Sequence, residues 1–350
     1  MTDGSNNPLV SVVIPTWNGR RLLSQCVSAL STAASELPAG EVEIIVVDDA
    51  STDGTSLWLS SEWPSVRVLT LSRNRGFAAA ANAGIRAARS PWIALLNNDA
   101  LPEPSWLREA RLDSRPLNVA AVASKIVSLN SLNLIESAGD GYTSAGLAFQ
   151  DSNGSSDSPR RVFSACAAAA FYRKSALSDV GPFEERLESY YEDVDLSYRL
   201  NLRGWHVVYE PACVVRHAGS SSYGPRSRRR LSNSSRNIEL VFFSCTPLPL
   251  LLRSVPRHIA ATLAQAALRA WQGQFPAFLA GKIEFVGSIP WVLRRRRVIQ
   301  NGDPSARKSV EEVIDPHWFR RHVATRMKRP SRPPAPLKEA QSTQTIPVAQ

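Results

Sequence analysis

The chain has 350 residues, of which 43% are hydrophobic and 21% are charged, the proportions of an ordinary globular protein. These values exclude a mini-protein, a wholly disordered chain and a chain embedded entirely in a membrane. The formal net charge is +10, and the basic excess lies towards the C-terminus, for example in residues 228–230 and 294–297. These runs lack zinc-finger spacing and an RNA-binding aromatic signature, so we expect no nucleic-acid partner and favour an anionic membrane surface.

The cysteines and the N-terminal residues indicate the cellular compartment. The cysteines lie far apart and form neither a CxxC pair nor a zinc-binding pattern, so reduced thiols are expected; they are Cys26, Cys166, Cys213 and Cys245. The first apolar run covers only residues 9–14, which is too short for the core of a signal peptide. We therefore expect a cytoplasmic protein whose basic C-terminal part lies at the inner face of the cell membrane.

Strand-like and helix-like patterns alternate over the first hundred residues. Short apolar runs predict strands at residues 9–15, 43–47, 66–71 and 92–96. Apolar residues at helical spacing predict helices at residues 21–30 and 77–88. This order indicates an α/β fold with a mostly parallel sheet and right-handed crossovers. Ligands bind beyond the carboxyl ends of strands in such sheets, so the polar residues that follow each strand are the candidates for a site.

The remainder of the chain has a more varied composition. Residues 137–159 are rich in glycine and serine, which predicts a surface loop. Apolar residues recur at helical spacing within residues 226–300, but prolines interrupt them, which favours amphipathic or interfacial helices over membrane-spanning ones. From residue 301 the chain is basic and proline-rich, which predicts a largely disordered tail over 301–350. We accordingly expect a catalytic domain in residues 1–225, followed by the helical extension and the tail.

Acidic residues at two predicted strand ends allow both a structural and a functional interpretation. Asp48 can accept the imide N–H of a uracil or thymine ring, and we favour this role because an acid in a crevice is costly without a partner. Asp53, five residues on, is better explained as a helix cap. Asp99 offers a hard oxygen ligand for a metal beside a diphosphate, although a simple turn also explains Asn97-Asn98-Asp99. The acids in residues 192–195 suit the first turn of a helix.

Six motifs occur in a fixed order between Ser11 and His217. They are SVVIPTWNG at 11–19, VVDDASTDG at 46–54, NRGFA at 74–78, LLNND at 95–99, YYEDVDL at 190–196 and RH at 216–217. Together they resemble the large family of inverting, metal-dependent glycosyltransferases with the GT-A fold, which includes bacterial rhamnosyltransferases and galactofuranosyltransferases. The resemblance implies a GT-A domain, a Rossmann-like and mostly parallel sheet with flanking helices, followed here by a C-terminal helical extension.

The resemblance also implies a role for each matching residue. Nucleotide-sugar binding falls to Pro15, Thr16, Trp17, Asp48, Arg75 and Asn98. Asp99 matches the metal-binding acid and His217 a histidine that completes the metal site in several relatives, so Mn²⁺ or Mg²⁺ is the expected cofactor. Asp193 matches the catalytic base, with Glu192 and Tyr191 as candidates for contact with the acceptor or the sugar.

Three positions depart from the family pattern. Asn97 stands where many relatives have the first acid of an Asp-x-Asp motif, which implies weaker or neutral contact with the metal at that position. Ala167 replaces a usual glycine, and Glu184 replaces a usual aspartate. The departures affect the expected acceptor pocket and leave the nucleotide, metal and base positions filled.

The function implied is transfer of a sugar from a nucleotide diphosphate to an acceptor hydroxyl with inversion. The residue 190–196 pattern and the basic extension are most similar to rhamnosyltransferases, which implies dTDP-rhamnose as donor and a lipid-linked or polysaccharide acceptor of the cell envelope. The alternatives are a UDP-sugar donor, such as galactofuranose, galactose or N-acetylglucosamine, and a non-catalytic carbohydrate-binding relative.

Other nucleotide-binding enzymes fit the sequence less well. A dinucleotide-binding dehydrogenase needs GxGxxG after the first strand, where residues 18–21 read Asn-Gly-Arg-Arg, and a P-loop phosphotransferase needs GxxxxGK[ST], which is absent. A nucleotidyltransferase shares the architecture and would differ by releasing pyrophosphate.

Overall fold

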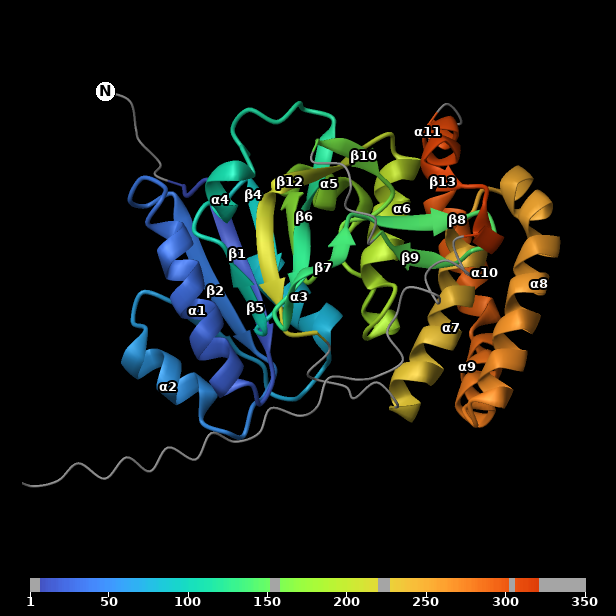
Figure 1. Ribbon diagram of the computed structural model, residues 1–350, viewed down its shortest axis with the longest axis horizontal. Coiled ribbons are helices and arrows are strands. Elements are labelled where there is room, and N and C mark those ends of the chain that lie inside the picture. Colours follow the sequence, from blue (N-terminus) through green and yellow to red (C-terminus); the bar gives the residue numbers. More distant parts are fainter. Residues whose placement is uncertain (1–6, 152–157, 220–226, 302–305, 321–350) are drawn as a thin grey trace, which may run out of the picture.

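The computed structural model describes residues 7–151, 158–219, 227–301 and 306–320. A central sheet lies between helices, and a block of C-terminal helices packs at one side of it (Figure 1). The sheet follows the strand order β10-β12-β6-β11-β4-β1-β2-β3, with β5 and β7 paired to it at β12 and β6.

The N-terminal part of the chain alternates between strands and helices, as the sequence predicts. Its elements are β1 (Val10–Thr16), α1 (Arg20–Ala34), β2 (Val42–Asp48), α2 (Thr55–Glu62), β3 (Arg67–Thr70), α3 (Phe77–Ala87) and β4 (Trp92–Leu96). β1 pairs in parallel with β2 and β4, and β2 pairs in parallel with β3. β1 and β4 are buried along their whole length, as expected for parallel strands that are covered on both faces.

The other half of the sheet mixes strand directions. Its elements are β5 (Ala100–Pro102), α4 (Trp106–Glu109), β6 (Val119–Ser128), β7 (Ser131–Ala138), β10 (Arg160–Val162), β11 (Ala169–Arg173) and β12 (His206–His217). β11 lies antiparallel between β4 and β6, whereas β12 runs parallel to β6. β5 pairs antiparallel with the end of β12, which places His217 opposite Ala100. The predicted α/β class with flanking helices is confirmed.

The predicted surface loop at residues 137–159 is wrong over its described part. The chain there forms β8 (Asp140–Thr143) and β9 (Ala148–Gln150), and the Asp140 and Tyr142 side chains are buried. Gly139 takes a φ of +80° between β7 and β8, a conformation that favours glycine, so its composition reflects a tight turn rather than a mobile loop. Residues 152–157 lie outside the described residues.

The helices after β11 build the second half of the molecule. They are α5 (Lys174–Val180), the 3-10 turn η1 (Glu185–Leu187), α6 (Glu192–Leu202), α7 (Arg228–Cys245), α8 (Leu248–Trp271), α9 (Phe275–Gly287), α10 (Ile289–Ile299) and α11 (Ala306–Val313). The C-terminal helices confirm the predicted helical extension. Within the described residues, no helix combines the length and the apolar character that crossing a bilayer demands.

The predicted disorder from residue 301 is wrong for residues 306–315. These residues form α11 and β13 (Ile314–Asp315), and β13 pairs in parallel with β8. Val310 is fully buried against α6 and α7 residues, so one apolar side chain anchors a segment of otherwise polar composition. The rest of the predicted tail, residues 321–350, lies outside the described residues.

The C-terminal helices share a hydrophobic core with the elements around α6. Leu187 and Tyr198 pack in one buried cluster with Leu240 and Val292. A buried polar network adds a second link, because the His258 ring lies 2.8 Å from both the Ala145 carbonyl oxygen and a Glu239 carboxylate oxygen. Helices α7, α8 and α10 therefore pack as part of the fold that surrounds α6.

Candidate active site

The carboxyl ends of β1, β2 and β4 meet at one edge of the sheet because the three strands are parallel. Thr16 ends β1, next to Pro15, and its hydroxyl accepts a 2.9 Å hydrogen bond from the Asn98 amide just beyond β4. Gly19 lies against the same amide, where an added Cβ would come within 2.3 Å of Asn98 Nδ2. The Trp17 side chain, between them, is 53% exposed. The structure thus brings together several of the predicted nucleotide-binding residues.

The two acids after β2 have different partners. The buried Asp48 accepts a 2.8 Å hydrogen bond from the Ser51 N–H and a second bond from the Ser56 hydroxyl. Asp49 accepts 2.8 Å bonds from the N–H groups of Arg75 and Gly76 and so fixes the loop before α3 to the end of β2. Burial raises the pKa of Asp49 although these two bonds lower it. Sequence reasoning missed Asp49, for which the paired acids were the available signal.

Arg75 and Asp53, both expected near the nucleotide end of the sheet, make contacts within the protein. The Arg75 guanidinium lies 2.6 Å from a Glu185 carboxylate oxygen, so in this conformation it pairs with η1. Asp53 accepts hydrogen bonds from the N–H groups of Thr55 and Arg20, at the starts of α2 and α1. The N-cap of α2 is Gly54 rather than Asp53, so Asp53 differs from the predicted helix cap and instead accepts hydrogen bonds from N–H groups at two helix starts.

Asp99 and His217 come together although 118 positions of sequence separate them, because β5 pairs with the end of β12. His217 Nε2 lies 3.2 Å from Asp99 Oδ1, and Nδ1 lies 2.9 Å from Glu136 Oε2 on β7. Within the described residues the buried Nε2 makes no aligned hydrogen bond, in spite of its proximity to Asp99. Glu136 was not predicted; only its place directly before the supposed loop was visible in the sequence.

These residues fit a divalent cation. A carboxylate oxygen and an imidazole nitrogen are ligands that Mn²⁺ accepts, and a carboxylate on the other ring nitrogen fixes the tautomer and orientation of such a histidine. Burial lowers the pKa of His217, but the adjacent carboxylates of Asp99 and Glu136 outweigh burial and raise it to about 9. Two carboxylates around one ring thus favour positive charge at this point, whether a proton or a metal ion supplies it.

Asp193, in the first turn of α6, is held by backbone N–H groups. Its Oδ1 accepts a 2.8 Å bond from Val194 and its Oδ2 a 3.2 Å bond from Ala167. The adjacent Ala168 carbonyl accepts the Asn97 N–H at 2.9 Å, so residues 167–168 link Asp193 to the turn that carries Asp99. Ala167 does not adopt a positive φ, so alanine fits where relatives have glycine. Burial raises the pKa of Asp193 although the hydrogen bonds oppose it.

Further acids surround Asp193. The side-chain ligand atoms of Asp140, Cys166 and Asp193 all lie within 4.8 Å of one another. Glu192 is buried, and its Oε2 has no hydrogen-bond partner among the described residues. Burial and the charge of Asp193 raise the pKa of Asp140 to about 8 and hold that of Glu192 well above its usual range. We call Asp140, Glu192 and Asp193 the acidic cluster; Asp140 was missed because its segment was predicted to be a surface loop.

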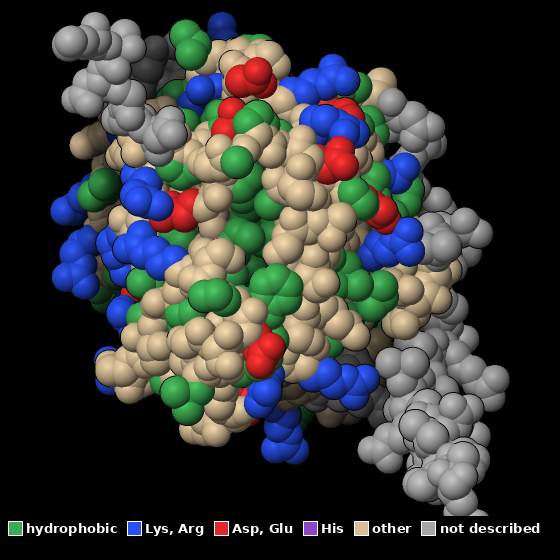
Figure 2. Space-filling view, turned by 90° about the vertical axis from the view of Figure 1, so that its left-hand side faces the viewer, with side chains coloured by type: hydrophobic (Ala, Val, Ile, Leu, Met, Phe, Trp, Pro, Cys, Tyr) green, Lys and Arg blue, Asp and Glu red, His purple; other side chains and the backbone are tan. Residues whose placement is uncertain are grey.

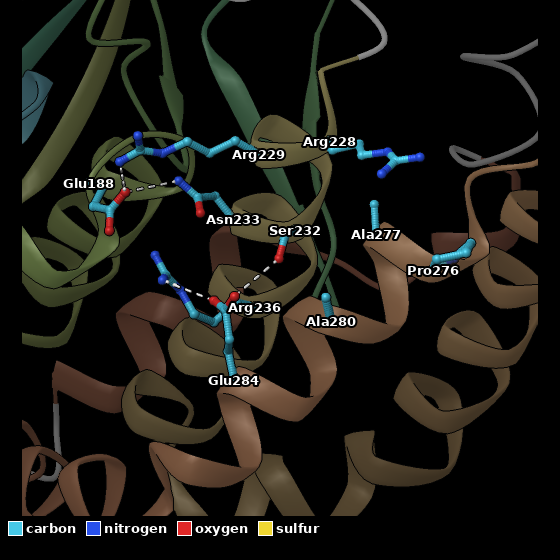
Figure 3. Close-up of a pocket in the computed structure, with 10 residues that line it drawn as sticks. All are labelled: Glu188, Arg228, Arg229, Ser232, Asn233, Arg236, Pro276, Ala277, Ala280 and Glu284. Atoms are coloured by element: carbon cyan, nitrogen blue, oxygen red, sulfur yellow. Dashed lines mark hydrogen bonds and ion pairs between the residues drawn. The ribbon is translucent and has the colours of Figure 1, made fainter.

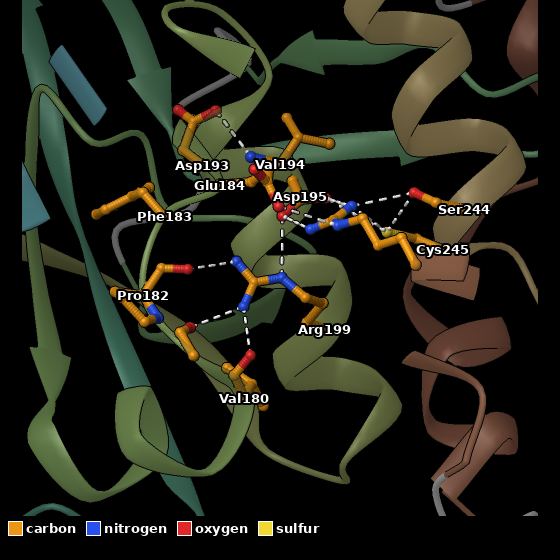
Figure 4. A network of polar contacts seen from close by, with 12 residues as sticks. Val180, Pro182, Phe183, Glu184, Asp193, Val194, Asp195, Arg199, Ser244 and Cys245 are labelled. Carbon is orange, nitrogen blue, oxygen red and sulfur yellow. Dashed lines mark hydrogen bonds and ion pairs between the residues drawn. The ribbon is translucent and has the colours of Figure 1, made fainter. Parts of the chain in front are cut away.

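Asp195, two residues after Asp193, lies in the opposite environment (Figure 4). It is fully buried, and its carboxylate lies 2.9 Å from Arg199 Nε and 2.6 Å from Arg295 Nη1. Burial alone would raise the pKa of Asp195, but the two guanidinium charges hold it at about 2. Arg199 also donates to the carbonyls of residues 180–182. We call Asp195, Arg199 and Arg295 the ion cluster; it ties α6 to α10.

The backbone before α6 is strained. Glu188, Tyr190 and Tyr191 have φ values of 58°, 72° and 71°, which side-chain-bearing residues rarely adopt. The Asn237 amide of α7 donates to the carbonyls of Leu187, Ser189 and Tyr190, and the Tyr191 hydroxyl accepts the Ala148 N–H at 3.1 Å. The C-terminal helices therefore hold the loop that presents Glu192 and Asp193.

Two surface cavities flank this site. One of about 770 Å³ lies beside the start of α1 and is lined in part by Gly19 and Asp53. The other, of about 480 Å³, lies between α7 and α9 (Figure 3). Two of its three arginines pair with glutamates in the lining, Arg229 with Glu188 and Arg236 with Glu284. On the side of the molecule where α1 and α2 lie, basic side chains occur at several separate places among hydrophobic and acidic ones (Figure 2).

Comparison with known proteins agrees with this geometry. Residues 11–181 match the family model described as Glycosyl transferase family 2. The chain is 28% identical over 276 residues to the pre-mycofactocin glycosyltransferase of Mycobacterium tuberculosis, an alignment that covers 77% of this chain and 53% of that protein. The chain thus spans about half the length of this relative.

A shorter relative and a solved structure extend the comparison. The N-acetylglucosaminyl-diphospho-decaprenol L-rhamnosyltransferase of M. tuberculosis is 28% identical over 246 residues, covering 62% of this chain and 78% of that protein. The mannosyltransferase PcManGT from Pyrobaculum calidifontis, solved in complex with GDP-Man and Mn²⁺, matches with a TM-score of 0.51 at 18% identity, covering 80% of this chain and 87% of that one. Such structural neighbours are GT-A glycosyltransferases, and the fold of this chain is of that type.

Proposed function

We propose that this chain, whose residues 11–181 match the family 2 glycosyltransferase model, transfers a sugar from a nucleotide diphosphate to an acceptor hydroxyl with inversion at the sugar. The observation that carries the proposal is the contact between Asp99 and His217, with Asp193 linked to the same turn through residues 167–168. We assign the catalytic domain to residues 1–225 and the helical extension to 226–300.

The donor would lie at the carboxyl ends of β1, β2 and β4. We assign the nucleotide to Pro15, Thr16, Trp17, Asp48 and Asn98, which line this edge or adjoin it. Asp48 already accepts two hydrogen bonds from its own loop, but a carboxylate has capacity for about four, so an imide N–H can still bind. Arg75 would reach the diphosphate after exchanging Glu185 for it, since both partners are anionic.

Asp99 and His217 would hold Mn²⁺ or Mg²⁺, and such an ion, when bound, neutralises the charge of a departing diphosphate. Glu136 keeps the His217 ring oriented. Asp193 accepts the proton of the acceptor hydroxyl while the acceptor oxygen bonds to the anomeric carbon and the bond from that carbon to the diphosphate breaks. Attack on the face opposite the leaving group inverts the configuration. Glu192 and Tyr191 flank Asp193 on the acceptor side of this arrangement.

For the donor sugar we propose rhamnose from dTDP-rhamnose, with a lipid-linked or polysaccharide acceptor of the cell envelope. Similarity to the decaprenol-linked rhamnosyltransferase over 78% of its length supports this choice. A UDP-sugar donor is the second candidate, and a non-catalytic carbohydrate-binding role is the third.

We further propose that the extension rests on the anionic inner face of the cell membrane. Exposed apolar side chains of α8, α9 and α10 support this; they include Leu252, Ile259, Leu263, Leu279, Ile283, Val286, Leu293 and Val298. Of the four consecutive arginines, Arg294 and Arg297 are exposed, whereas Arg295 and Arg296 bind inward to α6 and α7. The free thiols of the described cysteines fit a cytoplasmic location.

The test is a panel of nucleotide sugars, with and without Mn²⁺, read as release of the nucleoside diphosphate by the full chain. We expect dTDP release from dTDP-rhamnose that chelator abolishes and that Asp99→Ala does not support. Release of pyrophosphate instead, from a sugar phosphate and a nucleoside triphosphate, would reassign the enzyme as a nucleotidyltransferase. Binding of a sugar without any turnover would favour the non-catalytic alternative.

A further inference from the structure

The inference concerns Asp140, which neither the motifs nor the proposed mechanism uses. Asp140 opens β8 and is buried, 7% exposed, with its carboxyl beside those of Asp193 and the thiol of Cys166, all within 4.8 Å. A buried carboxyl this close to a second one is costly unless a cation or a proton compensates the charge.

The position of Asp140 is enforced by the backbone. Its N–H donates to the Ser164 carbonyl at 2.8 Å, and the Ser164 N–H donates back to the Asp140 carbonyl at 2.9 Å. The Ser164 hydroxyl in turn donates to the Asp193 carbonyl at 3.3 Å, and Ala167 N–H binds the Asp193 carboxylate. One short segment, residues 164–167, therefore holds both acids, and Gly139 supplies the turn into β8.

Among the described residues, this pair has no cationic partner. Within the described residues, no lysine or arginine forms an ion pair with Asp140 or Asp193, in contrast to Asp195 with its two arginines. The polar partner of Asp140 is the Ser137 hydroxyl, which donates to it at 2.7 Å. Arg160 of β10 pairs with Asp151, at 3.0 Å.

We propose that Asp140 is a positioning residue for the reaction, which acts through Asp193: the two carboxyls, within 4.8 Å of each other, would repel as like charges, so one of them stays protonated and the pair carries a single negative charge. The proposal rests on the proposed function of Asp193 as the base. During transfer, the acceptor O–H bond breaks and its proton binds to the ionised Asp193 carboxylate, while the electron pair forms the new bond to the sugar and the bond from the sugar to the diphosphate breaks. The proton then leaves to solvent, which restores the singly charged pair.

The surrounding titratable groups reinforce this behaviour, because all are acids. Those that act electrostatically on the pair or respond to it are Asp151, Cys166, Tyr172, Tyr191, Glu192 and, through Glu192, Asp195. Burial raises the pKa of Asp140 to about 8, with the charge of Asp193 as the second cause. In the range below that value the pair retains a proton, and its two titration steps belong to the pair rather than to either residue.

Carboxyl titration of the full chain tests the pairing without any donor sugar. In protein labelled with ¹³C at aspartate carboxyls, Asp193→Asn and Asp140→Asn identify the two signals by their loss. We expect the Asp140 step to move to lower pH by roughly one unit or more in Asp193→Asn, since a like charge has been removed. Asp151→Asn is the matched control, and it should move the step far less because Arg160 pairs with Asp151. An Asp140 step at the same pH in wild type and Asp193→Asn overturns the proposal.

A second variant guards against misfolding of Asp193→Asn. Ser137→Ala removes the hydrogen bond that favours ionised Asp140, so the upper step of the pair should move to higher pH, the opposite direction. No movement in that variant also counts against the pairing. The pH profile of kcat/KM for dTDP-rhamnose distinguishes a failure of the pairing from a failure of the assigned base. An inactive Asp193→Asn variant together with an unchanged pH profile in Asp140→Asn refutes the pairing alone, whereas an active Asp193→Asn variant refutes the assigned base itself.

Discussion

Acids on the two sides of the first turn of α6 have pKa values that are shifted in opposite directions. On one side, the acidic cluster gathers Asp140, Glu192 and Asp193 without a cationic partner, and burial raises the pKa of each acid. On the other side, the ion cluster surrounds Asp195 with Arg199 and Arg295, which hold its pKa at about 2. The same helix turn, with the same kind of side chain, therefore carries the proposed proton acceptor on one face and a permanent anion on the other.

The difference shows that the groups packed around an acid, rather than its position on the helix, determine whether it suits the role of the proposed base or that of a structural ion. Asp193 and Asp195 share the favourable field of a helix N-terminus. Of these two acids, Asp195 is the one that forms ion pairs with arginines of the described residues. One of these arginines, Arg295, comes from α10, a hundred residues away in the chain. The C-terminal helices thus affect the candidate active site indirectly, because Arg295 holds Asp195 in an ion pair instead of leaving it free to accept a proton.

The sharpest way to break the comparison is Asp193→Asn, which keeps the shape and removes the proton acceptor. Turnover should fall by on the order of 10²-fold to 10⁴-fold, the range typical of a lost general base, while affinity for the nucleoside diphosphate changes little. Calorimetric binding and turnover on one preparation separate the two effects. Near wild-type turnover, or an equal loss of nucleotide binding, would move the base role to Glu192.

Asp195→Ala should instead unfold the protein more readily with no specific effect on proton transfer. It leaves two largely buried guanidinium groups without their carboxylate, a loss that costs about 3–5 kcal/mol of unfolding free energy in comparable buried pairs. Denaturant titration measures it. The control is Glu36→Gln, whose pair with Arg108 is exposed and should cost under about 1 kcal/mol. A comparable loss in both variants would refute the special role of the ion cluster.

The two clusters should also give stability opposite dependence on pH. Asp195, with a lowered pKa, stabilises the fold above its unfolded pKa of about 3.9, and this contribution is lost as pH falls towards 2. Asp140, with a raised pKa, contributes stability that is complete below about pH 4 and is lost as pH rises through about 8. The free energy of unfolding, measured from pH 5 to 9, should therefore decline less in Asp140→Asn than in wild type. An identical decline would exclude a raised pKa for Asp140.

At the proposed metal site, Glu136 is a fixed anionic partner of His217, and its loss should have a smaller effect than the changes above. Glu136→Ala should weaken Mn²⁺ binding by about 10-fold to 100-fold, the usual effect of losing such a partner, and Glu136→Gln should weaken it less. Calorimetric titration of the full chain with Mn²⁺ measures both. Unchanged affinity in Glu136→Ala would mean that the carboxylate serves only the fold.

The smallest expected effect distinguishes outward from inward arginines of α10. Arg294→Gln and Arg297→Gln should each reduce binding to anionic vesicles by about fivefold, because each removes one cation near the surface. Cosedimentation with phosphatidylglycerol vesicles, with phosphatidylcholine vesicles as the neutral comparison, reports it. Equal binding to both vesicle types would refute the proposed membrane surface.

The sequence predicted the N-terminal half in detail because its signals are local. The strands β1, β2 and β4 are apolar runs that end in polar residues, and these ends define the edge where Thr16, Asp48 and Asn98 lie. Parallel pairing then brings the ends together without further information. The motif order also singled out Asp99, His217 and Asp193, whose roles remain proposals. The prediction of a surface loop at residues 137–159 was wrong because the turns that join short strands have the same composition as a loop.

What the sequence alone determined is the α/β class, the alternating order of the first elements and the positions of the polar strand ends. Tertiary structure alone decided which acids meet which partners: Glu136 with His217, Asp140 with Asp193, and Asp195 with Arg295. The physical reason is that hydrophobic periodicity is a property of neighbouring residues, whereas the charge state of a buried acid depends on groups that the chain brings near from distant segments.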